Sequence, residues 1–320
     1  MNLSPEARQE LDNAAERLEE FAGEGLDVIS LTSHSVDEAP FLAKVVSKLS
    51  PLIGNFMELK IAQLLDENSD VGFRWERQDP GFPDAVLIDN VTDEILAGYE
   101  VKAWYVMSTE ITGRFRESLN LLRDKNVNVV VIAWCMSKIV YGQPHILGTL
   151  VVSGEEVARS RDNHYHNPPM YLTEEPQDTT GRTINLQQSN VNGYRLQEEK
   201  SDPVEIEKAK GVTYTMKEPH SPEAQAEVAH LRRELTYRLD TNFAKIDRID
   251  NQIIEDFKRR VMGQTFLGRN FAMWRKVMRN LESDNAETRE TAQRVIAKLY
   301  PVLETHKVDN EVSEESPEAH

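Results

Sequence analysis

The chain has 320 residues, of which 39% are hydrophobic and 28% are charged, with 15 glycines and 14 prolines. This composition excludes collagen-like, wholly disordered and membrane-spanning proteins, and the length is sufficient to bury a core. The net charge of −17 by itself argues against a nucleic-acid partner, because phosphates are bound by local positive potential.

Most of the acidic excess lies at the two ends of the chain. Residues 1–40 contain ten acidic and two basic residues, a net charge of −8, and residues 301–320 have a net charge of −5. Residues 41–300 have a net charge of only −4, and within them residues 258–280 contain seven bases and no acid. Local positive potential for a polyanion is therefore available despite the negative total.

The single cysteine, Cys135, lies in the apolar run 129–136 and cannot form an internal disulfide. The first twenty residues read as a charged helix rather than a signal peptide. No run reaches the roughly 18 apolar residues of a membrane span. We therefore expect a cytoplasmic protein without a membrane partner.

The first half of the chain predicts a mixed α/β core. Ser4 and Pro5 predict the start of a first helix, which extends to Phe21. After Pro40, apolar residues at helical spacing predict a longer helix that Pro51 should kink or divide. The pattern then predicts strands at 73–77, 84–89 and 95–107, a helix at 112–123, and strands at 128–136 and 146–152.

The second half is less regular after a short helix that ends near Arg161. Residues 164–200 are turn-rich and predict hairpins, and apolar spacing predicts a long helix over 223–257. The expected organisation is an acidic N-terminal helical segment at 1–40, a core with hairpin insertions at 41–200, a linker at 201–222, a C-terminal helical region at 223–306 and a disordered acidic tail at 307–320.

Three polar residues on two predicted strands form the strongest candidate site. Asp84 opens one strand, and Glu100 and Lys102 lie two residues apart on the next, so that their side chains share a face. A tight turn at 90–94 would make these strands antiparallel neighbours and bring the two carboxylates together. Two carboxylates can hold Mg²⁺, which keeps several waters and leaves positions for a phosphate and an attacking water. Metal-assisted phosphodiester hydrolysis is the natural chemistry of such a site.

The motif Pro83-Asp84, followed by Glu100-Val101-Lys102, resembles that of the PD-(D/E)XK nuclease superfamily, to which most type II restriction endonucleases belong. The resemblance covers about residues 41–152, where the predicted order of helix, three strands, helix and strand is that of the family core. It implies an α/β (α+β) fold with a restriction-endonuclease-like mixed central sheet flanked by helices, to which this chain adds a C-terminal helical region.

The resemblance also implies roles for individual residues. Asp84, Glu100 and the backbone carbonyl of Val101 would bind Mg²⁺, and Lys102 would orient or deprotonate the attacking water. Many members of the family place a glutamate from a helix at the site, a role that Glu58 matches.

The spacing of this motif is weak evidence by itself, because the chain contains four Asp/Glu-x-Lys triplets. Only the triplet at Glu100 lies in a predicted strand, and that strand follows the one that Asp84 opens. The alternative interpretation is that Glu100 and Lys102 form an ion pair on a solvated face, with Asp84 as a turn residue.

Two groups of bases are candidates for DNA contacts. Arg114 and Arg116 lie near the expected start of the helix at 112–123, whose free N–H groups could bind a phosphate, although a solvated helix face is equally compatible. We call residues 258–280 the basic segment. Its lysines and arginines suit contacts with a phosphate backbone. The alternatives are that they pair with acidic helices of the same chain or form a dimer contact. The bases of the segment are Lys258, Arg259, Arg260, Arg269, Arg275, Lys276 and Arg279.

The expected function is that of a magnesium-dependent type II restriction endonuclease that cuts double-stranded DNA at a specific sequence. A homodimer is expected, because cutting both strands of a two-fold site calls for two active centres, and region 223–306 would supply the DNA grip or the dimer contact. A cognate DNA methyltransferase would belong to the same system. The alternatives are a nonspecific, repair or phage-defence nuclease of the same superfamily, and a DNA-binding or scaffold protein without catalysis.

Overall fold

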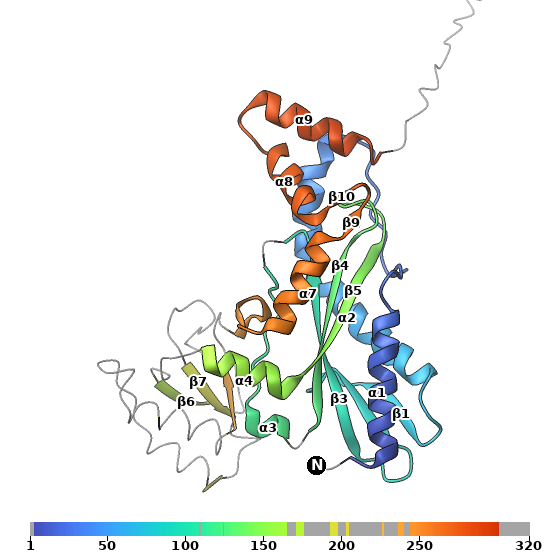
Figure 1. Cartoon of the computed structure of the whole chain (residues 1–320), viewed down its shortest axis with the longest axis vertical. Helices are drawn as coiled ribbons and strands as arrows, with labels where there is room; N and C mark the ends of the chain where they lie inside the picture. Colours follow the sequence, from blue (N-terminus) through green and yellow to red (C-terminus); the bar gives the residue numbers. More distant parts are fainter. Residues whose placement is uncertain are drawn as a thin grey trace, which may run out of the picture.

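The computed structural model describes residues 3–108, 110–123, 125–164 and 244–300, with short pieces at 171–175, 193–197, 203–204, 226 and 236–239. Its centre is a five-stranded sheet with the strand order β1-β2-β3-β4-β5 (Figure 1). Only β3 and β4 are parallel neighbours. The strands are β1 Phe73–Arg77, β2 Ala85–Asp89, β3 Ile95–Tyr105, β4 Val127–Met136 and β5 Pro144–Ser153.

The two faces of the sheet are covered by different helices. Because side chains alternate along a strand, Val101 of β3 belongs to the core under α1 and α2, whereas Trp104 belongs to the core under the other helices. Strand β4 is buried from Val129 to Met136, since both of its faces are covered, which explains its continuous apolar run. The mixed sheet flanked by helices confirms the predicted α/β fold class.

One face is covered by α1 Pro5–Glu20 and α2 Ala39–Glu67. The Ser4 side chain caps α1 by accepting a hydrogen bond from the backbone N–H of Ala7 (3.1 Å). Leu18 of α1 is fully buried in the same core as the sheet, so the acidic N-terminal segment is part of that core. Helix α2 runs through Pro51 without division.

A buried carboxylate ties α1 to the edge of the sheet. Glu10 is fully buried, pairs with Arg17 (2.5 Å) and accepts a hydrogen bond from the indole Nε1 of Trp75 in β1 (2.8 Å). A buried charge is tolerated when it is paired and hydrogen-bonded in this way. The contact explains why an acidic residue faces the core on a helix whose other acids are mostly exposed.

The opposite face is covered by helices that follow β3 and by the C-terminal helices. Phe257 of α7 packs edge-on against Trp104 of β3, with ring centroids 6.2 Å apart, so the C-terminal helices share one core with the sheet. Among the described helices, none has the length and apolarity of a membrane-spanning segment. These elements are α3 Leu119–Arg123, α4 Gly154–His164, η5 Ile246–Arg248, α7 Gln252–Gly263, β9 Thr265–Phe266, β10 Arg269–Asn270, α8 Phe271–Leu281 and α9 Ala286–Ala297.

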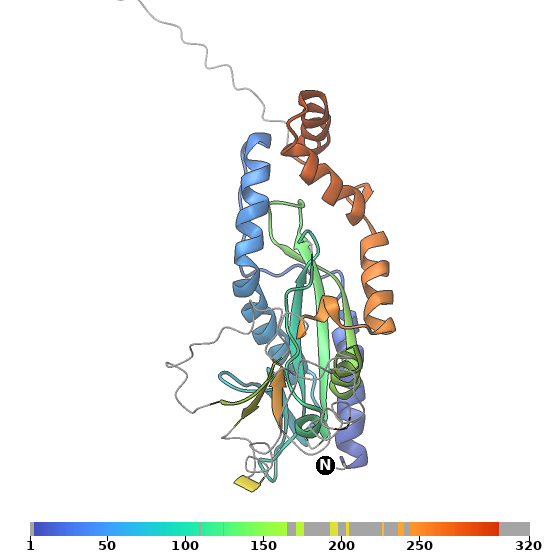
Figure 2. The same cartoon turned by 90° about the vertical axis from the view of Figure 1, so that its left-hand side faces the viewer.

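Helices α8 and α9 extend past the end of the sheet toward the N-terminal end of α2 (Figure 2). Lys44 of α2 forms an ion pair with Glu282, directly after α8 (2.5 Å). Ser33, just before the short helix η1 Val36–Glu38, contacts the Tyr300 hydroxyl (2.9 Å). The C-terminal helices therefore join the two sides of the molecule beyond the strand ends.

The predicted helix at 112–123 is wrong for its first seven residues, because only α3 is helical. The preceding backbone pairs instead with a distant segment: the N–H of Phe115 donates to the Ala244 carbonyl (2.8 Å), and the N–H of Ile246 donates to the Gly113 carbonyl (2.9 Å). These bonds satisfy the backbone groups that a helix would otherwise pair locally.

The predicted long helix at 223–257 is also wrong over its C-terminal part. Strand β8 Tyr237–Leu239 pairs antiparallel with β7 Gly193–Gln197, and α7 begins only where the Asn251 side chain accepts a hydrogen bond from the Ile254 N–H (3.2 Å). Strands β6 Tyr171–Glu175 and β7 are parallel, so they do not form the predicted hairpin. Most of the predicted linker and all of the predicted tail lie outside the described residues.

Candidate active site

The antiparallel pairing of β2 and β3 brings Asp84 and Glu100 together. Ala85 pairs with Tyr99, so one further step along each strand places Asp84 opposite Glu100. The Asp84 Oδ2 accepts a hydrogen bond from the backbone N–H of Val101 (2.7 Å), which fixes the carboxylate against β3. The predicted antiparallel pairing of the two strands is therefore confirmed, with a one-residue register shift between Leu87 and Ile88 that the turn does not predict.

Glu100 and Lys102 project from the same face of β3 and form an ion pair. The Lys102 Nζ lies 2.5 Å from Glu100 Oε1, and both side chains are only 13% exposed. The second carboxylate oxygen of Glu100, Oε2, is buried and has no hydrogen-bond partner among the described residues. This burial and this unpartnered oxygen argue against the alternative of an ion pair on a solvated face.

Glu58 reaches the same cluster from α2. Its Oε2 forms an ion pair with Arg77 at the end of β1 (3.0 Å), and its charge acts on both Asp84 and Lys102. Arg77 also pairs with Asp79 (3.0 Å). Arg77 has no place in the sequence motif, and it lies opposite Ala85 of β2 only because of the β1–β2 pairing in the folded sheet.

Burial and neighbouring charges shift the pKa of two groups in this cluster, Asp84 and Lys102. Burial, followed by the charge of Glu100, raises the pKa of Asp84 to about 7, and Lys102 only partly offsets this rise. Burial lowers the pKa of Lys102, but the charges of Glu100 and Asp84 outweigh burial and hold that pKa above its ordinary value. At neutral pH the cluster therefore contains a protonated lysine beside a carboxylate that resists ionisation.

A divalent cation fits these residues. Two carboxylates converge, one of their oxygens is buried without a partner, and the like charges raise a pKa that a cation would lower. Asp84, Glu100 and the Val101 carbonyl are the groups that would hold it. The described part of the chain contains no cluster of three or more metal-ligating side chains, so water would complete the shell, as is usual for Mg²⁺.

Replacement of Asp84 by asparagine is expected to stabilise the metal-free protein at pH 8. The pKa of Asp84 is higher in the folded chain than its ordinary value of 3.8, so folded protein binds more protons and loses stability as the pH rises from about 4 to 7. Asparagine removes this loss and still accepts the Val101 N–H. Thermal melting in chelator should show a higher Tm for Asp84→Asn at pH 8 and a difference that shrinks toward pH 4.

The matched control is Asp89→Asn at the other end of β2. Hydrogen bonds from the backbone N–H groups of Thr92 and Val91 lower the pKa of Asp89, so this variant should be less stable than wild type at pH 8. Added Mg²⁺ should raise the Tm of wild type and not that of Asp84→Asn. A lower Tm for Asp84→Asn at pH 8 would contradict the charge cluster.

The two arginines predicted near the start of a helix do not lie at a helix start. Arg114 and Arg116 lie in the extended segment before α3, and Arg114 forms a β-bridge with Lys245. Helix α3 has only five residues and starts after both arginines. The phosphate contact predicted from free N–H groups at a helix start is therefore not available to them.

The basic segment is divided between paired and open cations. Lys258 pairs with Glu255 (2.7 Å) and Asp247 (3.1 Å), and Arg259 pairs with Asp256. Two of the basic residues of α7 therefore pair with acidic residues of the same chain, as the alternative interpretation predicts.

The remaining bases of the segment have no carboxylate partner among the described residues. Arg260 lies over the Phe257 ring (5.3 Å to the centroid) and Arg269 over the Trp274 ring (5.9 Å). Arg275 donates from Nε to the Val106 carbonyl (2.7 Å). Lys276 and Arg279 are exposed on α8.

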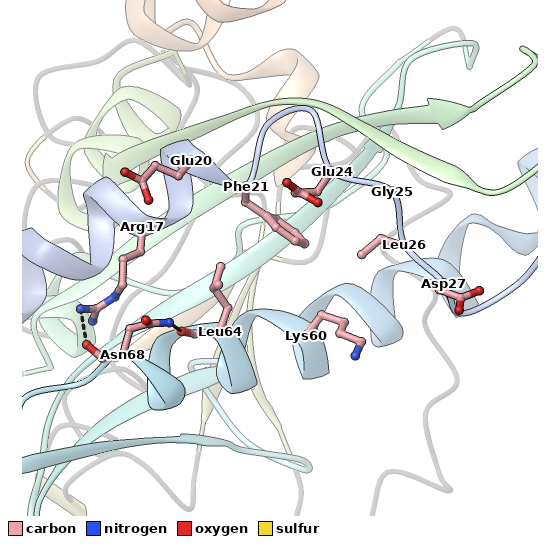
Figure 3. Close-up of a pocket in the computed structure, with 10 residues that line it drawn as sticks. All are labelled: Arg17, Glu20, Phe21, Glu24, Gly25, Leu26, Asp27, Lys60, Leu64 and Asn68. Atoms are coloured by element: carbon pink, nitrogen blue, oxygen red, sulfur yellow. Dashed lines mark hydrogen bonds between the residues drawn. The ribbon is translucent and has the colours of Figure 1, made fainter.

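A separate pocket of about 500 Å³ lies between the end of α1 and the second half of α2 (Figure 3). Its side chains include Arg17, which donates to the Asn68 carbonyl (2.7 Å), and Lys60. None of the residues that line it belongs to the carboxylate cluster.

Comparisons of the chain with protein-family models, with curated proteins and with solved structures give no match. The described side chains and their contacts are therefore what indicates a function.

Proposed function

We propose that the protein is a magnesium-dependent DNA endonuclease of the PD-(D/E)XK type that hydrolyses phosphodiester bonds. The observation that supports this most is the β2–β3 register, which sets Asp84 opposite Glu100, while Lys102 shares the face of Glu100. The partnerless Oε2 of Glu100 favours a site that binds a cation over a purely structural ion pair.

The role proposed for Lys102 follows from its charge. Its pKa is held above the ordinary value, so Nζ keeps its proton at neutral pH. A protonated ammonium can orient an attacking water and stabilise the negative charge that develops on the phosphate, but it cannot accept the proton of that water. Of the two roles implied by the family resemblance, orientation is therefore the one that the electrostatics favour.

The role proposed for the carboxylates is to hold the metal ion. Asp84 and Glu100, with the Val101 carbonyl, would hold Mg²⁺, which would supply a Lewis acid for the phosphate and its attacking water. Glu58, anchored by Arg77, adds negative charge beside them. Arg77 acts on the site through Glu58 and is therefore a positioning residue.

We further propose that cleavage is sequence-specific, as in type II restriction, and that the protein acts as a cytoplasmic homodimer on double-stranded DNA beside a cognate methyltransferase. Two active centres related by a two-fold axis suit a two-fold DNA site. A methyltransferase gene next to the gene for this chain would support the restriction role.

The test is incubation of plasmid and phage DNA with the purified protein, in Mg²⁺ and in chelator. Discrete bands that require Mg²⁺ support restriction, and a Mg²⁺-dependent smear supports a nonspecific nuclease in its place. Equal results with and without Mg²⁺, or no cleavage of any DNA, would contradict the proposal.

Gly98 is expected to be essential for the position of Asp84. A Cβ at residue 98 would lie 2.3 Å from Cγ of Pro83 and 2.6 Å from the Ala85 carbonyl oxygen, so the Pro83-Asp84 backbone must shift. A displacement of about 1 Å at a reacting centre costs about 100-fold in rate. Gly98→Ala should therefore lower kcat by about that factor, and overpacking should cost about 1–3 kcal/mol in unfolding free energy.

Gly72→Ala, before β1, is the control, because a Cβ there meets no atom within 4 Å. Its cleavage rate should equal that of wild type. Single-turnover cleavage and urea unfolding measure both effects, and full activity in Gly98→Ala would show that the close approach to Pro83 does not position Asp84.

A further inference from the structure

A groove lies beyond the end of the sheet, on the side of α2 that also carries Glu58. Its volume is about 780 Å³, and it is bounded by the first half of α2, the segment after β3, and α8. Ser47 in the groove and Glu58 are separated by about three turns of α2, so they lie on the same face of that helix. Thr112 in the groove adjoins Gly113, where a Cβ would lie 3.1 Å from Cδ of Lys102.

Two arginines of α8 line this groove without an acidic partner. Arg275 and Arg279 are one helical turn apart, and neither forms an ion pair with any described residue. The Nε of Arg275 donates to the Val106 carbonyl, which holds its guanidinium at the end of β3 (2.7 Å). Burial lowers the pKa of Arg275; the charge of Asp247 opposes this effect, and the charge of Arg279, the smallest of the three influences, adds to it. Like charges one turn apart repel, and a bound anion relieves that repulsion.

The acidic residues of the groove are already engaged. Glu282 pairs with Lys44 between α8 and α2 (2.5 Å), and Glu110 pairs with Lys245 (2.5 Å). Neither carboxylate is therefore free to neutralise the two arginines. The groove presents a net positive charge that suits phosphate groups.

The other walls of the groove suit unpaired bases rather than a duplex. Met107, Met262 and Met278 line it, and thioether groups make favourable contacts with aromatic rings. Helices α2 and α8 contact each other beside these methionines. The flat faces of bases are free in a single strand and can pack on such side chains, whereas in a duplex they are stacked on one another.

We propose that this groove binds a single-stranded segment of the DNA substrate, with Arg275 and Arg279 on its phosphates and its bases against the methionines. The proposal rests on the proposed function for the identity of the substrate. The site itself is a binding site, so it is tested without cleavage.

The experiment measures fluorescence anisotropy of a short labelled single-stranded oligonucleotide. The parent protein is Lys102→Ala in chelator, which prevents cleavage. Arg279→Gln should weaken binding by about 10-fold, the effect of one charged hydrogen bond, and should lower the slope of log affinity against log salt by about 0.7, the value for one phosphate on a single strand. Arg275→Gln should have the same effect.

Arg8→Gln is the matched control, since Arg8 is an exposed arginine of α1 that forms no ion pair with a described residue. The control removes the same charge and should bind like the parent. Because Arg279 is exposed, Arg279→Gln should keep the melting temperature of the parent. The proposal can therefore be tested with this variant even if Arg275→Gln does not fold.

Three results would overturn the proposal. They are no binding of the single strand by the parent, equal losses in Arg279→Gln and Arg8→Gln, and a blunt duplex of the same sequence that binds as tightly with the same dependence on Arg279. Failure of the proposed function has a different signature, because wild type would then bind the single strand through Arg279 and cleave no DNA in Mg²⁺.

Discussion

Replacement of Lys102 by alanine is expected to lower Mg²⁺-dependent DNA cleavage by about 100- to 1,000-fold. The ammonium group lies 2.5 Å from Glu100 and its side chain is only 13% exposed, and no other described lysine pairs with Glu100. Loss of one positioned hydrogen-bond donor that stabilises transition-state charge costs about 100- to 1,000-fold. Single-turnover cleavage of plasmid DNA measures the effect.

Lys60→Ala is the matched control for this variant. Lys60 ends the Asp/Glu-x-Lys triplet that starts at Glu58, but it lies exposed on α2 and belongs to the separate pocket. Its removal should leave the cleavage rate unchanged. DNA binding in chelator should persist in Lys102→Ala, which separates loss of catalysis from loss of substrate affinity. If Lys102→Ala cleaves like wild type, Lys102 and Glu100 form only a structural ion pair.

The sequence predicts the site pair well because the relevant interactions are local. The turn at 90–94 makes β2 and β3 antiparallel neighbours, which needs only short-range information. The exact register does not follow from the turn, because it shifts by one residue between Leu87 and Ile88 before it sets Asp84 opposite Glu100. The apolar stripe likewise predicts α2, but the predicted division at Pro51 does not occur, because a long buried face outweighs the cost of one proline. The mixed sheet follows from these elements.

Long-range pairing explains the predictions that are wrong. The segment at Phe115 has a helical apolar spacing, yet its N–H bonds to the Ala244 carbonyl, more than a hundred residues away in the chain. The apolar positions near Leu239 suit a helix face equally well, yet that segment is part of β8. Spacing reports which residues are buried, but it cannot report which distant backbone satisfies their hydrogen bonds.

The contact between Glu58 and Arg77 was inaccessible for the same reason. The helix position of Glu58 indicates an acidic residue on an apolar face, but the partner comes from the end of β1, which is brought near only when the sheet packs on α2. The requirement for glycine at position 98 is similar. A side chain there would clash with the Pro83 ring, which lies just before the neighbouring strand β2.

Replacement of Arg161 by methionine is expected to cost about 3–5 kcal/mol in the free energy of unfolding. The Arg161 side chain is fully buried; its Nη1 donates to the Phe115 carbonyl (2.9 Å) and the Glu117 carbonyl (3.1 Å), and its Nε donates to Asp162 (2.9 Å). Methionine fills similar volume but leaves the buried Asp162 without this cation. The same bonds fix the segment that leads from Gly113 to α3, so its anchoring depends on them.

A second variant separates the lost charge pair from the lost carbonyl contacts. Arg161→Met combined with Asp162→Asn removes the buried charge and should recover part of the stability, whereas the bonds to the Phe115 and Glu117 carbonyls stay lost. Urea unfolding measures both variants, with an unchanged m-value as the check that each still unfolds in one cooperative step. If Arg161→Met costs less than about 1 kcal/mol, the level of a surface ion pair, then Arg161 does not anchor this segment. Since Gly113 in the same segment adjoins Lys102, a loss of several kcal/mol should be accompanied by slower cleavage at temperatures where the protein remains folded.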